Sequence, residues 1–470
     1  MERRETVLEF EKISERTAEL AREFYSRCSY RLCEYSVGVK LMWRDYYHTA
    51  FAVSHGCLVV RNRVDGRYIF EYPVPGAEGD ELAAIDEIEK YCREQDIDVE
   101  FFAVPEEKVP RLAARYPRAE LTRDRRWQDY IYLGEEISQF TGKKFSGQRN
   151  HINKFTRSYP DYTFQPITKD DDLETFWRDF SADFGKTSSI ARRELKYARE
   201  LLSTAVDSGM FCSGSIKAGG RLVAVCLGEK CGDTMVVHIE KALQEYEGVY
   251  PTMVREFARY YGGGVTYFNR EDDACDKGLR TSKLQYQPWT MGDKCRIKTG
   301  SELIQLRRIP VLETERLRLT PLRREDIPEY NRLCLDDERN RWWGYDYREN
   351  LKGELTEDYF FRGAASDFRR RRALNFAVRL GDRFIGEAVL WNFDNKGRAE
   401  LGCRILPEFA GQGYGREAFS RAADWALYEL GVRVLEGKCF KENLPSKKML
   451  ESCMRSVGED DKYFRFEKVV

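Results

Sequence analysis

The sequence predicts a layered α/β protein of three units. Its 470 residues exceed what a single hydrophobic core usually supports, and 42% apolar with 33% charged residues is the composition of a globular protein. Short apolar runs of alternating pattern, which are typical of strands, are separated by segments with helical periodicity. In the first two thirds of the chain, an order of strands, a helix and a further strand occurs twice without a visible sequence repeat.

The first predicted unit covers residues 1–135. Apolar stretches predict a meander of strands, at 50–53, 57–60 and 68–70. A helix is predicted over 81–94, because apolar side chains recur there at three-residue spacing, at Leu82, Ile85, Ile88 and Tyr91. Strands at 99–104 and 127–133 complete this unit.

The second predicted unit covers residues 136–298. It carries predicted strands at 162–164, 210–216, 222–227 and 234–239. A helix over 250–261 precedes a last strand at 265–268. Residues 296–311 are the best candidate for a linker, and we place the boundary of the third unit near residue 305.

The third predicted unit covers residues 305–470. It opens with a half-buried strand in which Leu317 and Leu319 alternate with polar residues. A later strand at 399–406 is followed by a glycine-rich turn and a helix. In that helix apolar residues recur every four positions, at Ala418, Ala422, Ala426 and Leu430. Gly431 follows at the position of a C-cap glycine.

Composition and charge exclude several classes of protein. The 78 Lys and Arg residues nearly cancel the 79 Asp and Glu residues, which argues against a protein whose main task is to coat nucleic acid or anionic membrane. The thirteen cysteines are scattered without a CxxC pair, so we expect no metal site and a reducing compartment. We find no apolar run of membrane-spanning length and no signal-peptide core, and therefore expect a cytoplasmic protein.

The glycine-rich turn Gly411-Gln412-Gly413-Tyr414-Gly415 predicts an anion site. Backbone N–H groups at the start of a helix have no intrahelical partner, and the positive end of the helix dipole adds to them. Glycines let the backbone approach a pyrophosphate without an intervening Cβ. The alternative is a loop that only turns the chain, but the strand, turn and helix follow in the order that a binding site requires.

Three ordered motifs in the last third resemble the GNAT N-acetyltransferases that modify ribosomal-protein N-termini and related amines. They are LETERLRLTPL at 312–322, AELGCRILPEFAGQGYGREA at 399–418 and KENLPSKKML at 441–450. The resemblance implies acetyl-CoA as the acyl donor, with its pyrophosphate bound by the backbone of Gly411 to Gly415. It also assigns cofactor contacts to Leu406, Asn443 and Ser446. The family pattern has Arg or Gln where this chain has Ala410.

The same resemblance implies the catalytic groups. Glu400 matches the acidic position that serves as general base, because an amine nucleophile must lose a proton before it attacks. Tyr463 is the candidate acid that reprotonates the sulfur of CoA. For each residue a plain structural role remains open: an ion-paired Glu400 on a strand edge, and Tyr463 as part of the core.

A second constellation of charged side chains lies at predicted strand ends in the second unit. Clusters of this kind form either a substrate site or a buried ion-pair network that holds a loop. The candidates are His238, Glu240, Lys241, Asn269, Arg270, Glu271, Arg280 and Lys283. A basic run from Lys143 to Arg157, with interleaved aromatics, suits either phosphate binding or a solvated helix face.

Residues 8–295 resemble the C-terminal catalytic domain of phosphatidylglycerol lysyltransferases, and more closely its free-standing relatives. The motifs are at 129–155, 238–251 and 269–288. The resemblance implies a tandem of two GNAT-like folds, and hence three GNAT-like units in the chain. Acetyl transfer to a primary amine of a small molecule or peptide is the leading hypothesis. Aminoacyl transfer from tRNA by residues 8–295, and a non-catalytic module that binds CoA or peptide, are the alternatives.

Overall fold

The computed structural model describes residues 8–182, 189–344, 346–351 and 353–470. The chain divides into two compact units. Unit 1 consists of Met1–Pro110 with Glu120–Lys298, and unit 2 of Arg111–Ala119 with Thr299–Val470. Among the helices described, none combines the length and the apolar character that crossing a membrane requires.

The first sheet of unit 1 carries the predicted meander. Its strands lie in the order β1, β2, β3, β4, β6, β15, β7, with β5 paired to β3. Their bounds are Glu11–Lys12 (β1), Ala50–Ser54 (β2), Cys57–Val64 (β3), Arg67–Glu71 (β4), Val74–Pro75 (β5), Glu100–Pro105 (β6), Glu120–Arg123 (β7) and Lys294–Lys298 (β15). The helices up to residue 115 are α1 (Glu15–Tyr25), α2 (Val37–Met42), α3 (Arg44–Tyr47), α4 (Glu81–Glu94) and α5 (Val109–Arg115). Helix α4 has the predicted bounds, and the Asp80 carboxylate caps its N-terminus.

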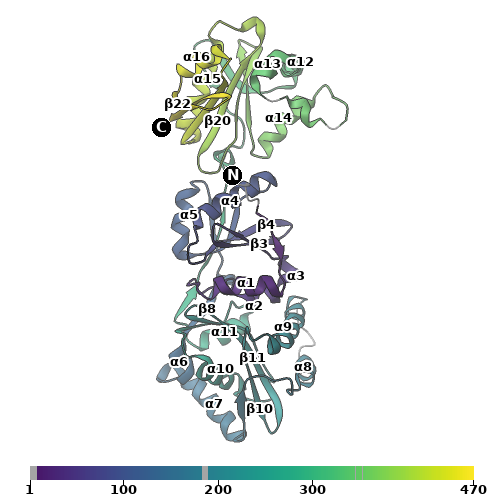
Figure 1. The fold of residues 1–470 in the computed structure, drawn as a ribbon, viewed down its shortest axis with the longest axis vertical. Coiled ribbons are helices and arrows are strands. Elements are labelled where there is room, and N and C mark those ends of the chain that lie inside the picture. Colours follow the sequence, from purple (N-terminus) through teal and green to yellow (C-terminus); the bar gives the residue numbers. More distant parts are fainter. Residues whose placement is uncertain (1–7, 183–188, 345, 352) are drawn as a thin grey trace. The chain divides into compact units, whose positions relative to one another are not determined.

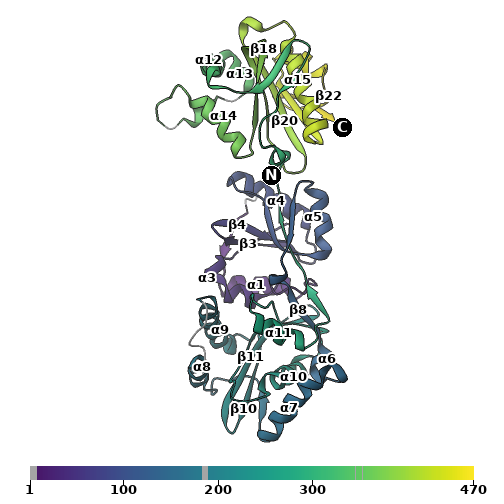
Figure 2. The ribbon, with the colours of Figure 1, turned by 180° about the vertical axis from the view of Figure 1, so that it is seen from behind.

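The second sheet of unit 1 has helices on both faces. Its strand order is β14, β8, β13, β12, β11, β10, β9. The bounds are Asp129–Leu133 (β8), Thr163–Gln165 (β9), Cys212–Ala218 (β10), Arg221–Cys231 (β11), Thr234–Ala242 (β12), Tyr267–Asn269 (β13) and Thr290–Gly292 (β14). Figures 1 and 2 show one group of helices on one face, α6 (Gly134–Gln139), α7 (Ser146–Ser158) and α10 (Val249–Tyr261). On the other face lie α8 (Leu173–Ala182) and α9 (Ser189–Ser208), while α11 (Lys277–Gln285) follows β13.

The two halves of unit 1 exchange strands. We expected residues 127–133 to close the first half, but β8 pairs with β13 and β14 of the second sheet, and Trp127 lies in a short 3₁₀ turn. In return, β15 leaves the second half and pairs with β6 and β7 of the first sheet. Local apolar patterns identify strands but not their partners, so the sequence did not reveal this exchange.

The third sheet lies in unit 2, with the order β16, β17, β18, β19, β20, β21, β23, β22. Its strands are Leu312–Glu313 (β16), Leu317–Pro321 (β17), Leu374–Leu380 (β18), Arg383–Trp391 (β19), Arg398–Ile405 (β20), Val434–Phe440 (β21), Arg455–Glu459 (β22) and Tyr463–Val469 (β23). The helices are α12 (Ile327–Cys334), α13 (Asp337–Trp343), α14 (Tyr359–Arg369), α15 (Tyr414–Trp425) and α16 (Leu444–Glu451). One core forms with Ala418 and Ala422 of α15, and a second with Tyr330 of α12 and Phe360 of α14.

All three sheets share one local feature. After an antiparallel meander and a helix, the next strand pairs in parallel with the last meander strand over only two or three residues. The parallel pairs are β4 with β6, β12 with β13, and β20 with β21. This repeat supports the prediction of three related α/β units.

Candidate active site

Strands β20 and β21 separate where the candidate catalytic residue lies. Their parallel pairing runs from Arg398↔Val434 to Glu400↔Glu436 and ends there, although β20 continues to Ile405 and β21 to Phe440. Among the described strands, none pairs with β20 on this side beyond Glu400. The two strands therefore part beyond Glu400, and we call the space between their unpaired ends the opening.

Two consecutive tryptophans from the end of α13 cover this opening on one face. The Trp343 ring lies against Gly402 of β20, where any Cβ would come within 2.8 Å of it. Trp342 packs against Phe440 of β21, with ring centroids 6.2 Å apart. The end of α13 thus contacts both β20 and β21, the two strands that border the opening.

The glycine turn has the geometry of an anion site. Gly411 and Gly413 have φ angles of 77° and 83°, a conformation that L side chains rarely adopt, and Gly413 is the N-cap of α15. Gly413 has no side chain with which to cap this helix terminus. A Cβ at Gly411 would meet no atom within 4 Å, so the backbone is accessible at the point where the N–H groups of the first turn need partners.

The other predicted cofactor residues have structural roles in addition. The Leu406 side chain is 1% exposed in the core, and its N–H donates to the carbonyl of Ile385 over 2.9 Å. Asn443 is the N-cap of α16, where its Oδ1 accepts from the N–H of Ser446 over 3.2 Å. Both residues of this cap come directly after β21, the strand that borders the opening.

Glu400 is a buried carboxylate held by two side chains that sequence reasoning missed. Its Oε2 accepts hydrogen bonds from Nδ2 of Asn392 at 3.0 Å and from Nζ of Lys438 at 3.1 Å. Lys438 lies on β21 two residues beyond Glu436, the cross-strand neighbour of Glu400. The Lys438 contact leaves no local signal because Lys438 is far along the chain, and the Asn392 contact depends on the register of β19 and β20, in which Trp391 lies opposite Glu400.

Tyr463 lies on the other side of β21. It is paired with Phe440 across β21 and β23, with ring centroids 4.8 Å apart, and the Lys438 ammonium is 5.7 Å from its ring centroid. Its hydroxyl lies beside Gly344, 3.8 Å from where a Cβ would stand. The Lys438 ammonium of β21 therefore lies between Glu400 of β20 and the Tyr463 ring of β23.

Arg316 is a further residue that the sequence did not single out. It lies in the turn between β16 and β17, and its Nη1 donates to the carbonyl oxygen of Gln412 over 3.1 Å. Its guanidinium also lies over the Tyr414 ring, 4.6 Å from the centroid. A cation from a part of the chain distant in sequence thus lies at the glycine turn.

In unit 1, part of the predicted constellation does come together. His238 has a fully buried side chain, with Nδ1 2.9 Å from Oε1 of Glu271 and Nε2 3.5 Å from Oε1 of Glu229. Burial alone would lower the pKa of His238, but these carboxylates raise it to about 9. Glu271 has a φ angle of 56°, a strained value for a non-glycine residue. Glu229 was not among the predicted residues.

The remaining predicted residues of unit 1 pair within a structural network. Arg270 binds Glu240 at 2.7 Å, Lys241 binds Glu194 at 2.8 Å, and Arg280 binds Asp273 at 2.8 Å. Asn269 donates to Asp129, and the Lys283 ammonium donates to three carbonyls of the loop after β13. For these residues the structure favours the second interpretation, a buried network that holds a loop.

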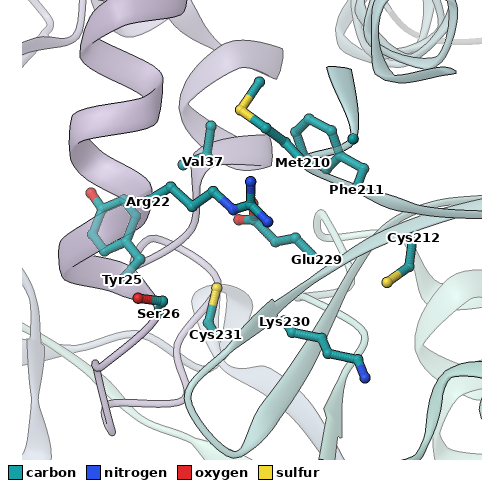
Figure 3. A pocket seen from close by; sticks show the side chains of 11 residues that line it. Arg22, Tyr25, Ser26, Val37, Met210, Phe211, Cys212, Glu229, Lys230 and Cys231 are labelled. Atoms are coloured by element: carbon teal, nitrogen blue, oxygen red, sulfur yellow. The ribbon is translucent and has the colours of Figure 1, made fainter. Parts of the chain in front are cut away.

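A small cavity of about 130 Å³ in unit 1 has Glu229, the neighbour of His238, in its wall. Figure 3 shows it between α1, α2 and the ends of β10 and β11, with Arg22 and Glu229 pointing toward one another across it. Its walls include Val37, Met210 and Phe211. Glu229 thus connects the cavity to the buried pair of His238 and Glu271.

The second half of unit 1 repeats the glycine N-cap of α15, but there the backbone is covered. Gly248 caps α10 with a φ angle of 87°. A Cβ at this position would lie 2.1 Å from the carbonyl oxygen of His151 in α7. Helix α7 therefore occupies the space that a pyrophosphate would need at this helix terminus.

One cluster in unit 1 has the composition of a metal site, but a lysine fills it. Cys33, Glu34 and Asp129 place potential ligand atoms within 4.8 Å of one another. The Lys294 ammonium lies 2.8 Å from both carboxylates and 3.3 Å from the sulfur of Cys33. Because this ammonium already supplies the positive charge, the arrangement does not suit a metal ion.

The predicted basic run lies on the 3₁₀ turn before α7 and on α7 itself. Lys144 binds Glu136 and Lys154 binds Glu247, while Arg149 donates to the carbonyls of Phe140 and Gly142. Several of these cations are therefore already paired, which reduces the positive charge available to nucleic acid.

Comparison with known proteins confirms both resemblances. The family "Phosphatidylglycerol lysyltransferase, C-terminal" matches residues 26–294, and the family "Acetyltransferase (GNAT) domain" matches residues 316–453. A conserved protein of unknown function from Bacteroides thetaiotaomicron VPI-5482 is 31% identical, with a TM-score of 0.56, over 62% of this chain and 99% of that protein. An uncharacterized N-acetyltransferase of Bacillus subtilis (strain 168), YoaA, is 25% identical over 144 residues, which are 30% of this chain and 80% of YoaA.

Proposed function

Because the chain belongs to the phosphatidylglycerol lysyltransferase C-terminal family and also carries an acetyltransferase (GNAT) domain, we propose that this second domain transfers an acetyl group from acetyl-CoA to a primary amine. The acceptor is a small molecule or the N-terminus of a peptide or protein. One observation carries the proposal: an accessible glycine N-cap at α15 follows directly after a strand that separates from its neighbour at a buried glutamate.

In this proposal the opening between β20 and β21 holds the thioester. Backbone N–H groups of the glycine turn bind the pyrophosphate of the donor, and Glu400 accepts the proton that the amine gives up. The amine nitrogen attacks the thioester carbonyl, the carbon–sulfur bond breaks, and the sulfur takes a proton from Tyr463. An unpaired N–H on the edge of β20 stabilises the oxyanion that forms in between.

Lys438 contributes to the acceptor side of the same site. Its ammonium lies 3.1 Å from Glu400, so an amine that reaches this carboxylate also approaches a fixed positive charge. A nearby like charge disfavours the protonated form of the amine. Lys438 therefore helps the acceptor to arrive as the neutral nucleophile.

The test is acetyl transfer to a broad panel of amines, with calorimetry of acetyl-CoA binding. Glu400→Gln should lower the transfer rate by about 10²-fold or more and leave acetyl-CoA affinity within a factor of about two. Glu436→Gln is the matched control, because Glu436 lies opposite Glu400 in the register but binds Arg398. Full activity of Glu400→Gln would remove the base assignment. Tight acetyl-CoA binding without transfer to any amine would favour the non-catalytic alternative.

A second candidate function belongs to unit 1: acyl transfer from a donor other than CoA, with aminoacyl-tRNA as the candidate. It is favoured by the cavity that Glu229 connects to His238 and Glu271, and by the covered N-terminus of α10.

The discriminating experiment is a gel shift with charged tRNA at several salt concentrations. The double variant Lys143→Gln, Lys144→Gln should weaken the complex. Arg149 is not substituted, because it donates to two loop carbonyls and its loss would disturb the fold. No shift at low salt would remove this function.

A further inference from the structure

The glycine turn of α15 lacks a cation within its own segment. Ala410, which precedes Gly411, has an uncharged side chain at the position where the resemblance leads us to expect Arg or Gln. Backbone N–H groups and the helix dipole supply only partial charges, whereas a pyrophosphate diester carries two negative charges. Arg416 follows the turn in the first turn of α15, and a side chain from another part of the domain adds further positive charge to this site.

Arg316 is held where it supplies that charge. Its Nη1 donates to the Gln412 carbonyl, and its Nη2, which forms an ion pair with Oε2 of Glu417 at 2.7 Å, lies 3.4 Å from the position of a Cβ on Gly413. Tyr414, the first residue of α15, presents its ring to the guanidinium at 4.6 Å. The side chain is 43% exposed, and Nη1 and Nη2 each carry a second N–H beside the one bound by Gln412 or Glu417.

Glu417 in the first turn of α15 fixes the orientation of the guanidinium. Its Oε2 accepts from Nε of Arg316 at 2.7 Å, and its Oε1 accepts from Oγ1 of Thr314 at 2.6 Å and from the N–H of Arg316 at 2.9 Å. Burial alone would raise the pKa of Glu417, but these hydrogen bonds from Thr314 and Arg316 lower it below its ordinary value. The arginine is thus oriented before any ligand arrives.

We propose that Arg316 binds the pyrophosphate of the acyl donor and replaces the cation that is missing at Ala410. The inference rests on the proposed function, since it names a further contact of the same donor. A planar guanidinium stacked on an aromatic ring presents two parallel N–H groups, which match phosphate oxygens better than a lysine ammonium does.

The test is calorimetry of the full-length chain with CoA, dephospho-CoA and pantetheine. Arg316→Gln should weaken CoA binding about tenfold or more, since charge-assisted hydrogen bonds are lost. The loss should be equal for dephospho-CoA, which keeps the pyrophosphate, and absent for pantetheine, which lacks it. Arg316→Lys should restore only part of the affinity. Arg318→Gln is the matched control, because Arg318 lies two residues later, is similarly exposed and binds Glu313.

Glu417→Gln separates phosphate binding from a purely structural role. This variant removes the carboxylate that binds Arg316 but keeps the positive charge at the turn, so CoA affinity should stay the same or rise. Equal losses in Arg316→Gln and Glu417→Gln would overturn the proposal, and so would a loss that vanishes with dephospho-CoA. If the unchanged protein does not bind CoA at all, the proposed function fails. If it binds and Arg316→Gln binds equally well, only this inference fails.

Discussion

At the residue scale, the environment of Glu400 leads to a prediction about pH. Lys438→Met removes the positive charge that lies 3.1 Å from the carboxylate. The acceptor amine would then stay protonated to a higher pH, and the pH of half-maximal transfer should rise by about one unit. The measurement is a pH–rate profile with one fixed amine. Lys441→Met, which removes a lysine bound to Glu459, should leave the profile unchanged.

His238 leads to a second prediction at this scale. Its pKa is raised from 6.5 to about 9 in the folded protein, so the folded state holds this proton more tightly than the unfolded state. The resulting stabilisation, on the order of 3 kcal/mol, is complete below pH 6.5 and is lost as the pH rises through about 9. Calorimetric unfolding of unit 1 between pH 6 and 9.5 should show this loss. In His238→Gln the loss should be absent, whereas His151→Gln, at an exposed position, should retain it.

At the scale of elements, two glycines at the start of α15 differ in their backbone conformation. Gly413 has a φ angle of 83°, whereas Gly415 has no such conformation and a Cβ there would meet Ile405 at an ordinary 3.5 Å. Gly413→Ala should therefore weaken acetyl-CoA binding about tenfold, because a strained N-cap costs about 1–2 kcal/mol. Gly415→Ala should bind within a factor of about two. Calorimetry of both variants checks this, and equal affinities would mean that backbone conformation is not what the site needs.

Helices and the glycine turn could be predicted from sequence because their signals are local. The apolar spacing of α4 and the glycines before α15 each lie within about one helix length. Strand partners could not be predicted, so residues 127–133 were assigned to the first unit although β8 pairs in the second sheet, and the strand β15 was not predicted. For the same reason the sequence indicated Glu400 but not Lys438 or Asn392, which reach it through sheet register. Arg316 lies in the turn between β16 and β17, almost one hundred residues before the glycine turn that it contacts.

At the scale of the whole molecule, we predict that acetyl-CoA protects only unit 2. The accessible glycine N-cap lies in unit 2, whereas the corresponding terminus in unit 1 is covered by α7. At about 100 times the dissociation constant, binding stabilises the domain that holds the ligand by about 2.7 kcal/mol. Hydrogen exchange of the full-length chain should slow around residues 400–415 and stay unchanged around residues 238–250. Slower exchange at β12 would mean that unit 1 also binds the donor.

The place of β15 in the first sheet has a consequence for protein synthesis. This strand, Lys294–Lys298, lies between β6 and β7, although both partners leave the ribosome more than 170 residues earlier. Until translation passes residue 298, the nascent chain holds a first sheet with an unfilled position and exposed strand edges. Domains usually fold as they emerge, but here the first half must wait for the end of the second. Chaperones that bind extended segments should therefore associate with ribosomes that are translating this stretch.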